Sequence, residues 1–204
     1  SFFKDRLKIL AGVRRDEVKQ TFIRDDNPDP QRPELPYSEI QKSTTPQFGI
    51  NWFMTGSNVL YANFSESFTP TEGIRRNLDG TTSPKPVEKG EGWEVGAKTS
   101  LFDGRISATV AYFDITKTDV LRLSLDDAGE VFDLLLDGQM SQGFEVDFIF
   151  YPSENLQVIG GYANIDSEEV LPEGTVNFDS RIPGVPEHQV TLWGKYTFLE
   201  GVLE

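Results

Sequence analysis

Short turns and long polar connections alternate along this chain of 204 residues. The short ones are rich in turn-forming residues: 55–58 (TGSN), 102–105 (FDGR), 151–155 (YPSEN) and 198–201 (FLEG). The long ones are rich in Pro, Asp and Glu and lie at about 24–39, 69–87, 119–138 and 166–186. Every second connection of an up-and-down antiparallel meander lies at the same end. The chain is therefore predicted to gather its tight turns at one end and its long loops at the other.

The segments between these connections alternate apolar and polar residues, which is the period of a β-strand. Residues 142–155 (QGFEVDFIFYPSEN) place apolar side chains at every second position, with Glu145 and Asp147 between them; the apolar set is Phe144, Val146, Phe148 and Phe150. A second run, 93–98 (WEVGAK), sets Glu94 and Lys98 against an apolar side. We expect about eight strands in all. Near Phe113 and Ile159 both sides are apolar, so the faces stay unassigned there.

Composition excludes several classes of function. The chain has 33 acidic and 19 basic residues, a net charge of −14, and lacks the basic face that nucleic-acid binding requires. It has no cysteine, so thiolate metal sites, disulfides and cysteine nucleophiles are excluded. No apolar run approaches the roughly 18 residues of a membrane-spanning helix. Hydropathy alone would favour a soluble protein, but it does not detect membrane-spanning strands.

The loop pattern favours an outer-membrane barrel with short periplasmic turns and long extracellular loops. A tilted strand crosses the bilayer with roughly 9 to 11 residues, and its charged side chains must avoid lipid. We therefore expect Phe144, Val146, Phe148 and Phe150 to face lipid, and Glu94, Lys98, Glu145 and Asp147 to face the lumen. Aromatic residues near the tight turns, such as Trp52 and Tyr151, suit a membrane interface.

Four blocks of sequence resemble the TonB-dependent siderophore receptors. They are 60–73 (LYANFSESFTPTEG), 89–120 (KGEGWEVGAKTSLFDGRISATVAYFDITKTDV), 141–166 (SQGFEVDFIFYPSENLQVIGGYANID) and 181–198 (RIPGVPEHQVTLWGKYTF). The resemblance implies an all-β, antiparallel outer-membrane barrel of about 22 strands around a separate plug domain. It also implies binding and import of a ferric siderophore, driven by the TonB complex.

We interpret residues 1–204 as part of such a barrel domain, with the plug domain and the terminal strands absent. The expected location is the bacterial outer membrane, and the expected partners are outer-membrane lipid, a ferric siderophore and, through a missing N-terminal region, the TonB complex. The siderophore is the transported ligand, and no covalently bound cofactor is expected. Tyr37, Arg75 and Arg76, in expected extracellular loops, are the candidate ligand contacts, because rings and cations suit such complexes.

Catalysis is not expected. His188 is the single histidine, and one histidine without cysteine makes a poor transition-metal site, so no metal site is assigned. No serine has a nucleophile-elbow context. Two alternatives remain open at this point. One is a complete eight-stranded outer-membrane barrel with a structural or adhesive role, and the other is a soluble β-sandwich binding module with its aromatic residues inside.

Overall fold

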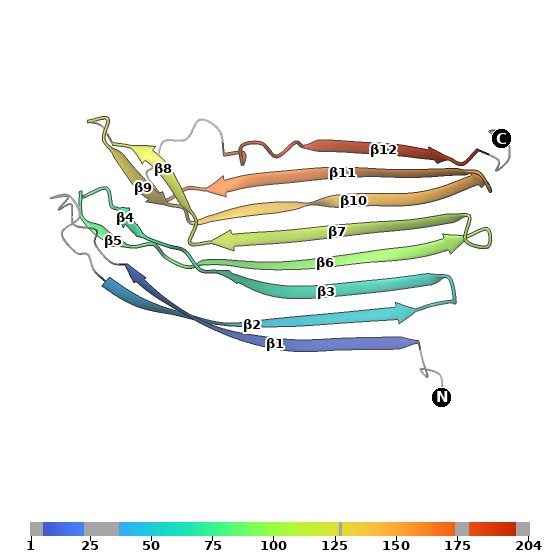
Figure 1. The fold of residues 1–204 in the computed structure, drawn as a ribbon, viewed down its shortest axis with the longest axis horizontal. Helices are drawn as coiled ribbons and strands as arrows, with labels where there is room; N and C mark the ends of the chain where they lie inside the picture. The colour runs from blue at the N-terminus through green and yellow to red at the C-terminus, as the bar shows by residue number, and fades with distance from the viewer. Residues whose placement is uncertain (1–5, 23–36, 127, 174–179, 199–204) are drawn as a thin grey trace, which may run out of the picture.

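A computed structural model describes residues 6–22, 37–126, 128–173 and 180–198. In this part the chain forms one eight-stranded antiparallel sheet, ordered β1-β2-β3-β6-β7-β10-β11-β12 (Figure 1). The strands are β1 (Leu7–Phe22), β2 (Tyr37–Phe53), β3 (Asn58–Thr69), β6 (Glu88–Leu101), β7 (Ile106–Thr118), β10 (Gly138–Ser153), β11 (Leu156–Val170) and β12 (His188–Tyr196). Each strand pairs with the sheet strand that precedes or follows it along the chain. The predicted meander is confirmed.

Among the described residues, the turns at 55–58, 102–105 and 151–155 lie at one end of the sheet and the long connections at the other, as predicted (Figure 1). The predicted turn at 198–201 and the predicted loop at 24–39 lie mostly outside the described residues. In the turn between β6 and β7, the Arg105 backbone N–H donates to the Phe102 carbonyl at 3.1 Å. Asp103 and Gly104, the two central residues, have φ of 56° and 88°. Two central residues with positive φ define a type I′ turn, whose twist matches that of the flanking strands. The glycine at this turn is thus needed for its conformation.

Two of the long connections hold small hairpins that the sequence reading had taken for plain loops. They are formed by β4 (Ile74–Arg76) with β5 (Thr82–Pro84) and by β8 (Leu121–Leu125) with β9 (Val131–Leu135). An aspartate organises each turn: Asp79 accepts hydrogen bonds from the Thr81 amide and hydroxyl at 2.9 and 2.6 Å. In the other turn, Asp126 accepts from the Ala128 and Glu130 amides at 2.9 and 2.8 Å.

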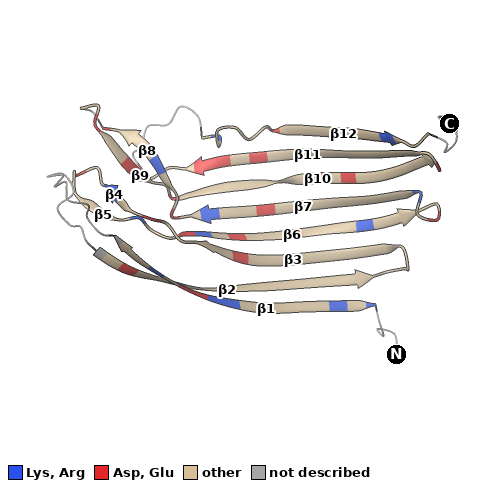
Figure 2. Ribbon diagram, viewed as in Figure 1, with Lys and Arg blue, Asp and Glu red and all other residues tan. Residues whose placement is uncertain are grey.

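Several strands are longer than the bilayer requires. β1 has 16 residues and β2 has 17, whereas about 9 to 11 tilted residues suffice to cross. The additional residues lie toward the loop end and include ion pairs such as Lys42 Nζ to Glu17 Oε2 at 3.1 Å. Figure 2 shows that charged residues are more numerous in the half of the sheet next to the loops. In this half the strands continue beyond the residues needed to cross the bilayer.

The sheet is a single layer with almost no enclosed core. Within the described residues, the buried apolar side chains are only Ala111, Val120 and Leu136. Large apolar side chains stay exposed, among them Phe144 at 41% and Val110 at 49%. A soluble β-sandwich would bury these groups between two sheets, so that alternative is wrong. No helix in the described part is long and apolar enough to cross a membrane.

Glycines let large side chains lie flat against the sheet. A Cβ on Gly96 would come within 2.6 Å of the Tyr61 ring and of the Val110 carbonyl oxygen. A Cβ on Gly160 would come within 2.4 Å of the Phe148 ring. Such glycines in strand interiors mark a close approach of a neighbouring group. Tyr61 and Phe148 therefore depend on them for their positions.

The sheet has two free edges and one partial separation. No ladder joins β1 to β12 in the described structure, so the eight strands do not close on themselves, and the complete eight-stranded barrel is wrong. The β2–β3 ladder runs only from the Phe53–Val59 pair to the Gln47–Ser65 pair, whereas β2 stays paired with β1 up to Tyr37. Beyond Gln47, β2 therefore parts from β3.

Candidate functional site

The register places the four predicted lumen residues on one face of the sheet, which we call the charged face. Lys98 is paired with Thr109, and Thr109 with Asp147, so these side chains share a side. Glu94 and Glu145 lie an even number of residues from Lys98 and Asp147 on the same strands, and alternation puts them on that side too. The four groups that the sequence analysis singled out thus lie on one continuous surface. That this surface faces the lumen stays a prediction.

The opposite, apolar face carries the four residues predicted to meet lipid. Their register partners on β7 are Tyr112 for Phe144, Val110 for Val146, Ala108 for Phe148 and Ile106 for Phe150. Toward the loop end this face becomes aromatic. Trp93 and Tyr112 have ring centroids 5.5 Å apart, and those of Phe144 and Tyr162 are 5.6 Å apart. Such rings suit the level of the membrane interface.

His188 joins this aromatic group and not a metal site. Its ring stacks on Tyr162 with centroids 6.2 Å apart, and Nδ1 lies 3.0 Å from the Tyr162 hydroxyl. Within the described ranges, no three His, Cys, Asp or Glu side chains cluster in a way that could hold a metal ion.

On the charged face, Tyr61 lies among the charged groups. The Lys98 ammonium lies 4.9 Å from the centre of the Tyr61 ring, within the range of a cation–π contact. Tyr61 occupies the space left by Gly96. Tyr61 is not among the site residues predicted from the sequence, because only the strand register brings it next to its neighbours on β6.

Nearer the loops, the same face has a second group of polar residues. The Glu169 carboxylate, only 6% exposed, accepts from Arg122 Nη1 at 2.5 Å and from Gln139 Nε2 at 3.1 Å. Lys117 Nζ lies 2.7 Å from Glu88 Oε2. None of these residues is among the site residues predicted from the sequence. They lie where the strands pass into the long connections, and their partners are up to 47 residues away.

The three candidate ligand contacts have different settings. Arg75 and Arg76 lie in β4, and Arg75 Nε donates to the Ser83 hydroxyl of β5 at 2.9 Å. Arg76 Nη1 lies 3.2 Å from Glu130 Oε2 of the β8–β9 turn. Tyr37 is the first residue of β2, where the sequence analysis had expected a loop, and its side chain lies outside the described part of the structure. The role of these three residues as ligand contacts stays a prediction.

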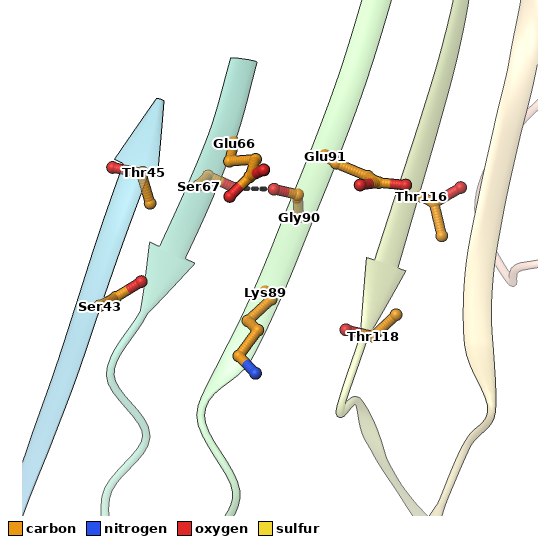
Figure 3. Close-up of a pocket in the computed structure, with 9 residues that line it drawn as sticks. All are labelled: Ser43, Thr45, Glu66, Ser67, Lys89, Gly90, Glu91, Thr116 and Thr118. Carbon is orange, nitrogen blue, oxygen red and sulfur yellow. Dashed lines mark hydrogen bonds between the residues drawn. The ribbon is translucent and has the colours of Figure 1, made fainter. Parts of the chain in front are cut away.

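A polar groove of about 250 Å³ lies beside the point where β2 parts from β3 (Figure 3). Four strands line it: Ser43 and Thr45 from β2, Glu66 and Ser67 from β3, Lys89 to Glu91 from β6, and Thr116 and Thr118 from β7. The Ser67 hydroxyl donates to the Gly90 carbonyl at 3.4 Å. Hydroxyl groups, two carboxylates and one ammonium can bind a polar group there. The groove contains no nucleophile paired with a base.

Comparison with known proteins assigns the family. Residues 1–203 match the family described as TonB dependent receptor-like, beta-barrel. The metal-pseudopaline receptor CntO of Pseudomonas aeruginosa (strain PAO1) is 33% identical over 201 residues, which are 98% of this chain and 27% of that protein. The ferrichrome outer membrane transporter/phage receptor of Escherichia coli K12 is 29% identical over 163 residues, which are 79% and 21%. The chain thus spans about a quarter of the length of these relatives.

Solved structures show the same fold. The ferric preacinetobactin receptor BauA of Acinetobacter baumannii superposes with a TM-score of 0.72 at 22% identity, over 96% of this chain and 28% of that one. The pyoverdine receptor FpvA of Pseudomonas aeruginosa PAO1 gives a TM-score of 0.70 at 17% identity, over 95% and 26%. The chain therefore belongs to the TonB-dependent receptor β-barrel family, whose members are outer-membrane receptors and transporters of Gram-negative bacteria and not enzymes.

Proposed function

We propose that the full-length protein binds and imports a metal chelate of the siderophore type, with a ferric siderophore as the leading candidate. The family match over almost the whole chain carries this proposal. The named ligands of the relatives support it, since they include metal-pseudopaline, ferrichrome and ferric pyoverdine. In this proposal, residues 1–204 form one arc of the barrel wall with the loops above it, and a plug domain and further strands come from outside this range.

Each part of the arc has its own task in this function. The apolar face meets lipid, and Glu94, Lys98, Glu145 and Asp147 line the lumen, where water or other protein groups solvate them. Tyr37 and Arg75 contact the chelate from the loop end. TonB supplies the energy through the N-terminal region.

The test is metal uptake by cells whose only outer-membrane receptor of this kind is the full-length protein. We would supply iron as the pseudopaline, ferrichrome or pyoverdine complex, in strains with and without TonB. The expected result is uptake of at least one complex that disappears without TonB. Failure of all three complexes, or uptake that persists without TonB, would overturn the proposal.

A second measurement tests the ligand contacts. Arg75→Ala removes a hydrogen-bond donor to an anionic ligand group, and bonds to charged groups contribute roughly 1.5 to 3 kcal/mol. We therefore expect Kd for the imported complex to rise about tenfold or more. Arg105→Ala, at the tight-turn end, is the matched control and should leave Kd unchanged. Equal Kd values for the two variants would exclude Arg75 as a contact.

A further inference from the structure

The β8–β9 hairpin is attached to the rest of the molecule at both of its ends. Its turn and β9 contact the β4–β5 hairpin, which we call the turn contact, and its base contacts the charged face of the sheet. Figure 1 shows the two hairpins together at the loop end, with β4 next to β9. The two contacts involve different residues and can be examined separately.

Arg76 makes this contact with two separate groups, one in β9 and one in the β8–β9 turn. Its backbone N–H donates to Asp133 Oδ2 at 2.9 Å, and its guanidinium Nη1 lies 3.2 Å from Glu130 Oε2. These partners are 57 and 54 residues away along the chain. Both carboxylates belong to the β8–β9 hairpin. The contact therefore joins the two hairpins beyond the end of the β6–β7 ladder, which stops at the Lys89–Thr118 pair.

Arg75 and Arg76 cannot perform the same task. Successive residues of a strand point to opposite sides, and in β4 these two residues have different partners. Arg75 Nε donates to Ser83 of its own hairpin, and only Arg76 reaches the other hairpin. Adjacent arginines, which look equivalent in the sequence, thus differ in which hairpin they contact.

The base of the β8–β9 hairpin is held by the buried carboxylate of Glu169. This group is 6% exposed and pairs with Arg122 of β8. Gln139 of β10 donates to its other oxygen, and the Glu169 amide donates to the Ser180 carbonyl in the β11–β12 connection at 2.6 Å. Removing the partner of a buried carboxylate leaves an uncompensated charge and strongly destabilises the folded protein. Glu169 therefore fixes the hairpin base firmly to the sheet.

We propose that Arg76 is a positioning residue that holds the two hairpins together, while Glu169 and Arg122 fix the hairpin base. In this arrangement Arg76 does not contact the ligand, and Arg75 is the arginine that can contact it. Only that last statement rests on the proposed import function. The coupling of the hairpins does not depend on any ligand.

The turn contact is the weaker of the two. The side chains of Arg76 and Glu130 are 44% and 62% exposed, and exposed ion pairs shift an equilibrium only slightly. We expect loss of the Arg76 side chain to raise the ratio of separated to joined hairpins roughly two- to fivefold. Loss of Asp133, which accepts from the backbone, should add to this effect.

The experiment measures the distance between the hairpins without any ligand. This stretch of chain contains no cysteine, so Leu78→Cys and Leu125→Cys place spin labels on the two hairpins of the full-length protein, after replacement of any cysteine outside this stretch. Both positions are exposed, at 67% and 64%. Electron–electron double resonance then gives the distance distribution. We expect a narrow distribution in the parent, a longer and broader component with Arg76→Ala, and more of that component with Arg76→Ala combined with Asp133→Ala.

Arg75→Ala is the matched control, since it removes the neighbouring arginine and should leave the distribution unchanged. The charge-exchanged pair Arg76→Glu with Glu130→Arg should restore the narrow distribution that Arg76→Glu alone loses. It should also restore uptake of whichever complex the parent imports, because a positioning role needs the pair and not a cation at position 76. An unchanged distribution with Arg76→Ala, or a failed rescue, would overturn the positioning role. A rescued distribution in a protein that imports none of the complexes would leave the coupling intact and contradict only the import function.

Discussion

The assignment of faces can be tested with two adjacent residues of β7. Val110 lies on the apolar face, 49% exposed, beside Val146 of β10 and Ala97 of β6. It is four residues from Ile106 at the turn end. At about 3.3 Å per residue and a tilt near 40°, it is about 10 Å above that level, close to the middle of an apolar band about 25 Å tall. Thr109 precedes it on the charged face, between Lys98 and Asp147.

Val110→Arg should destabilise the folded protein far more than Thr109→Arg. An arginine facing lipid near the midplane costs about 2 to 4 kcal/mol. At position 109 an arginine meets water, the Asp147 carboxylate on one side and the Lys98 ammonium on the other. Such exposed charge contacts change stability by less than about 1 kcal/mol. The larger cost corresponds to a change of roughly 30- to 900-fold in the unfolding equilibrium constant.

The assay is urea unfolding of the full-length protein in lipid vesicles, with the free energy extrapolated to zero urea. Thr109→Arg serves as the control for arginine itself, because the two positions are adjacent on one strand. A larger loss of stability in Thr109→Arg, or equal losses, would refute the assignment of the charged face to the lumen.

Three further predictions concern single features of the sheet and its hairpins. In single-tryptophan versions of the full-length protein, brominated lipid should quench the fluorescence of Trp52 and Trp93, which share the apolar face with Leu60 and Phe64. It should not quench Trp193, which is paired with Ile159 on the charged face. Quenching of Trp193 alone would contradict the register. Gly96→Ala should lower the free energy of unfolding in urea by roughly 1 to 3 kcal/mol, because the added Cβ meets the Val110 carbonyl and the Tyr61 ring. Gly56→Ala is the control, because a Cβ at position 56 meets open space. Equal stability of both variants would exclude the clash. The hydrogen bonds from the Thr81 hydroxyl and amide lower the pKa of Asp79. The ionised carboxylate should therefore stabilise the turn at pH values above the ordinary Asp pKa, and this stabilisation should be lost as pH falls through the lowered pKa. An NMR titration of the Asp79 carboxyl with a midpoint above the ordinary pKa would contradict this prediction.

Much of the main sheet could be predicted from the sequence because its strands alternate cleanly. The period-two pattern of residues 144–150 predicts both faces of β10. The register confirms that Glu145 and Asp147 lie on one face of the sheet and Phe144 and Phe148 on the other. The pattern failed near Phe113, since this apolar residue is paired with Glu94 on the charged face. Alternation cannot assign a side where both sides are apolar.

The hairpins and the contacts at the loop end were harder to predict. β8 does alternate, with Leu121, Leu123 and Leu125 around Arg122, and its turn contains glycine, so a strand could have been inferred there. β4 and β5 have three residues each, too few to show a period. The partners of Arg76 lie more than fifty residues away, and no spacing rule in one sequence connects them.

The parting of β2 from β3 makes this the mechanically weakest line in the sheet. Its ladder, from Phe53–Val59 to Gln47–Ser65, is the shortest between neighbouring strands of the main sheet. A ladder pulled open from one end breaks its hydrogen bonds one after another, so the total work of separation grows with the number of pairs and is smallest for the β2–β3 ladder. Under a force that peels strands from the β1 edge, the wall would tear between β2 and β3. β1 and β2, paired along their full lengths, would come away as one hairpin.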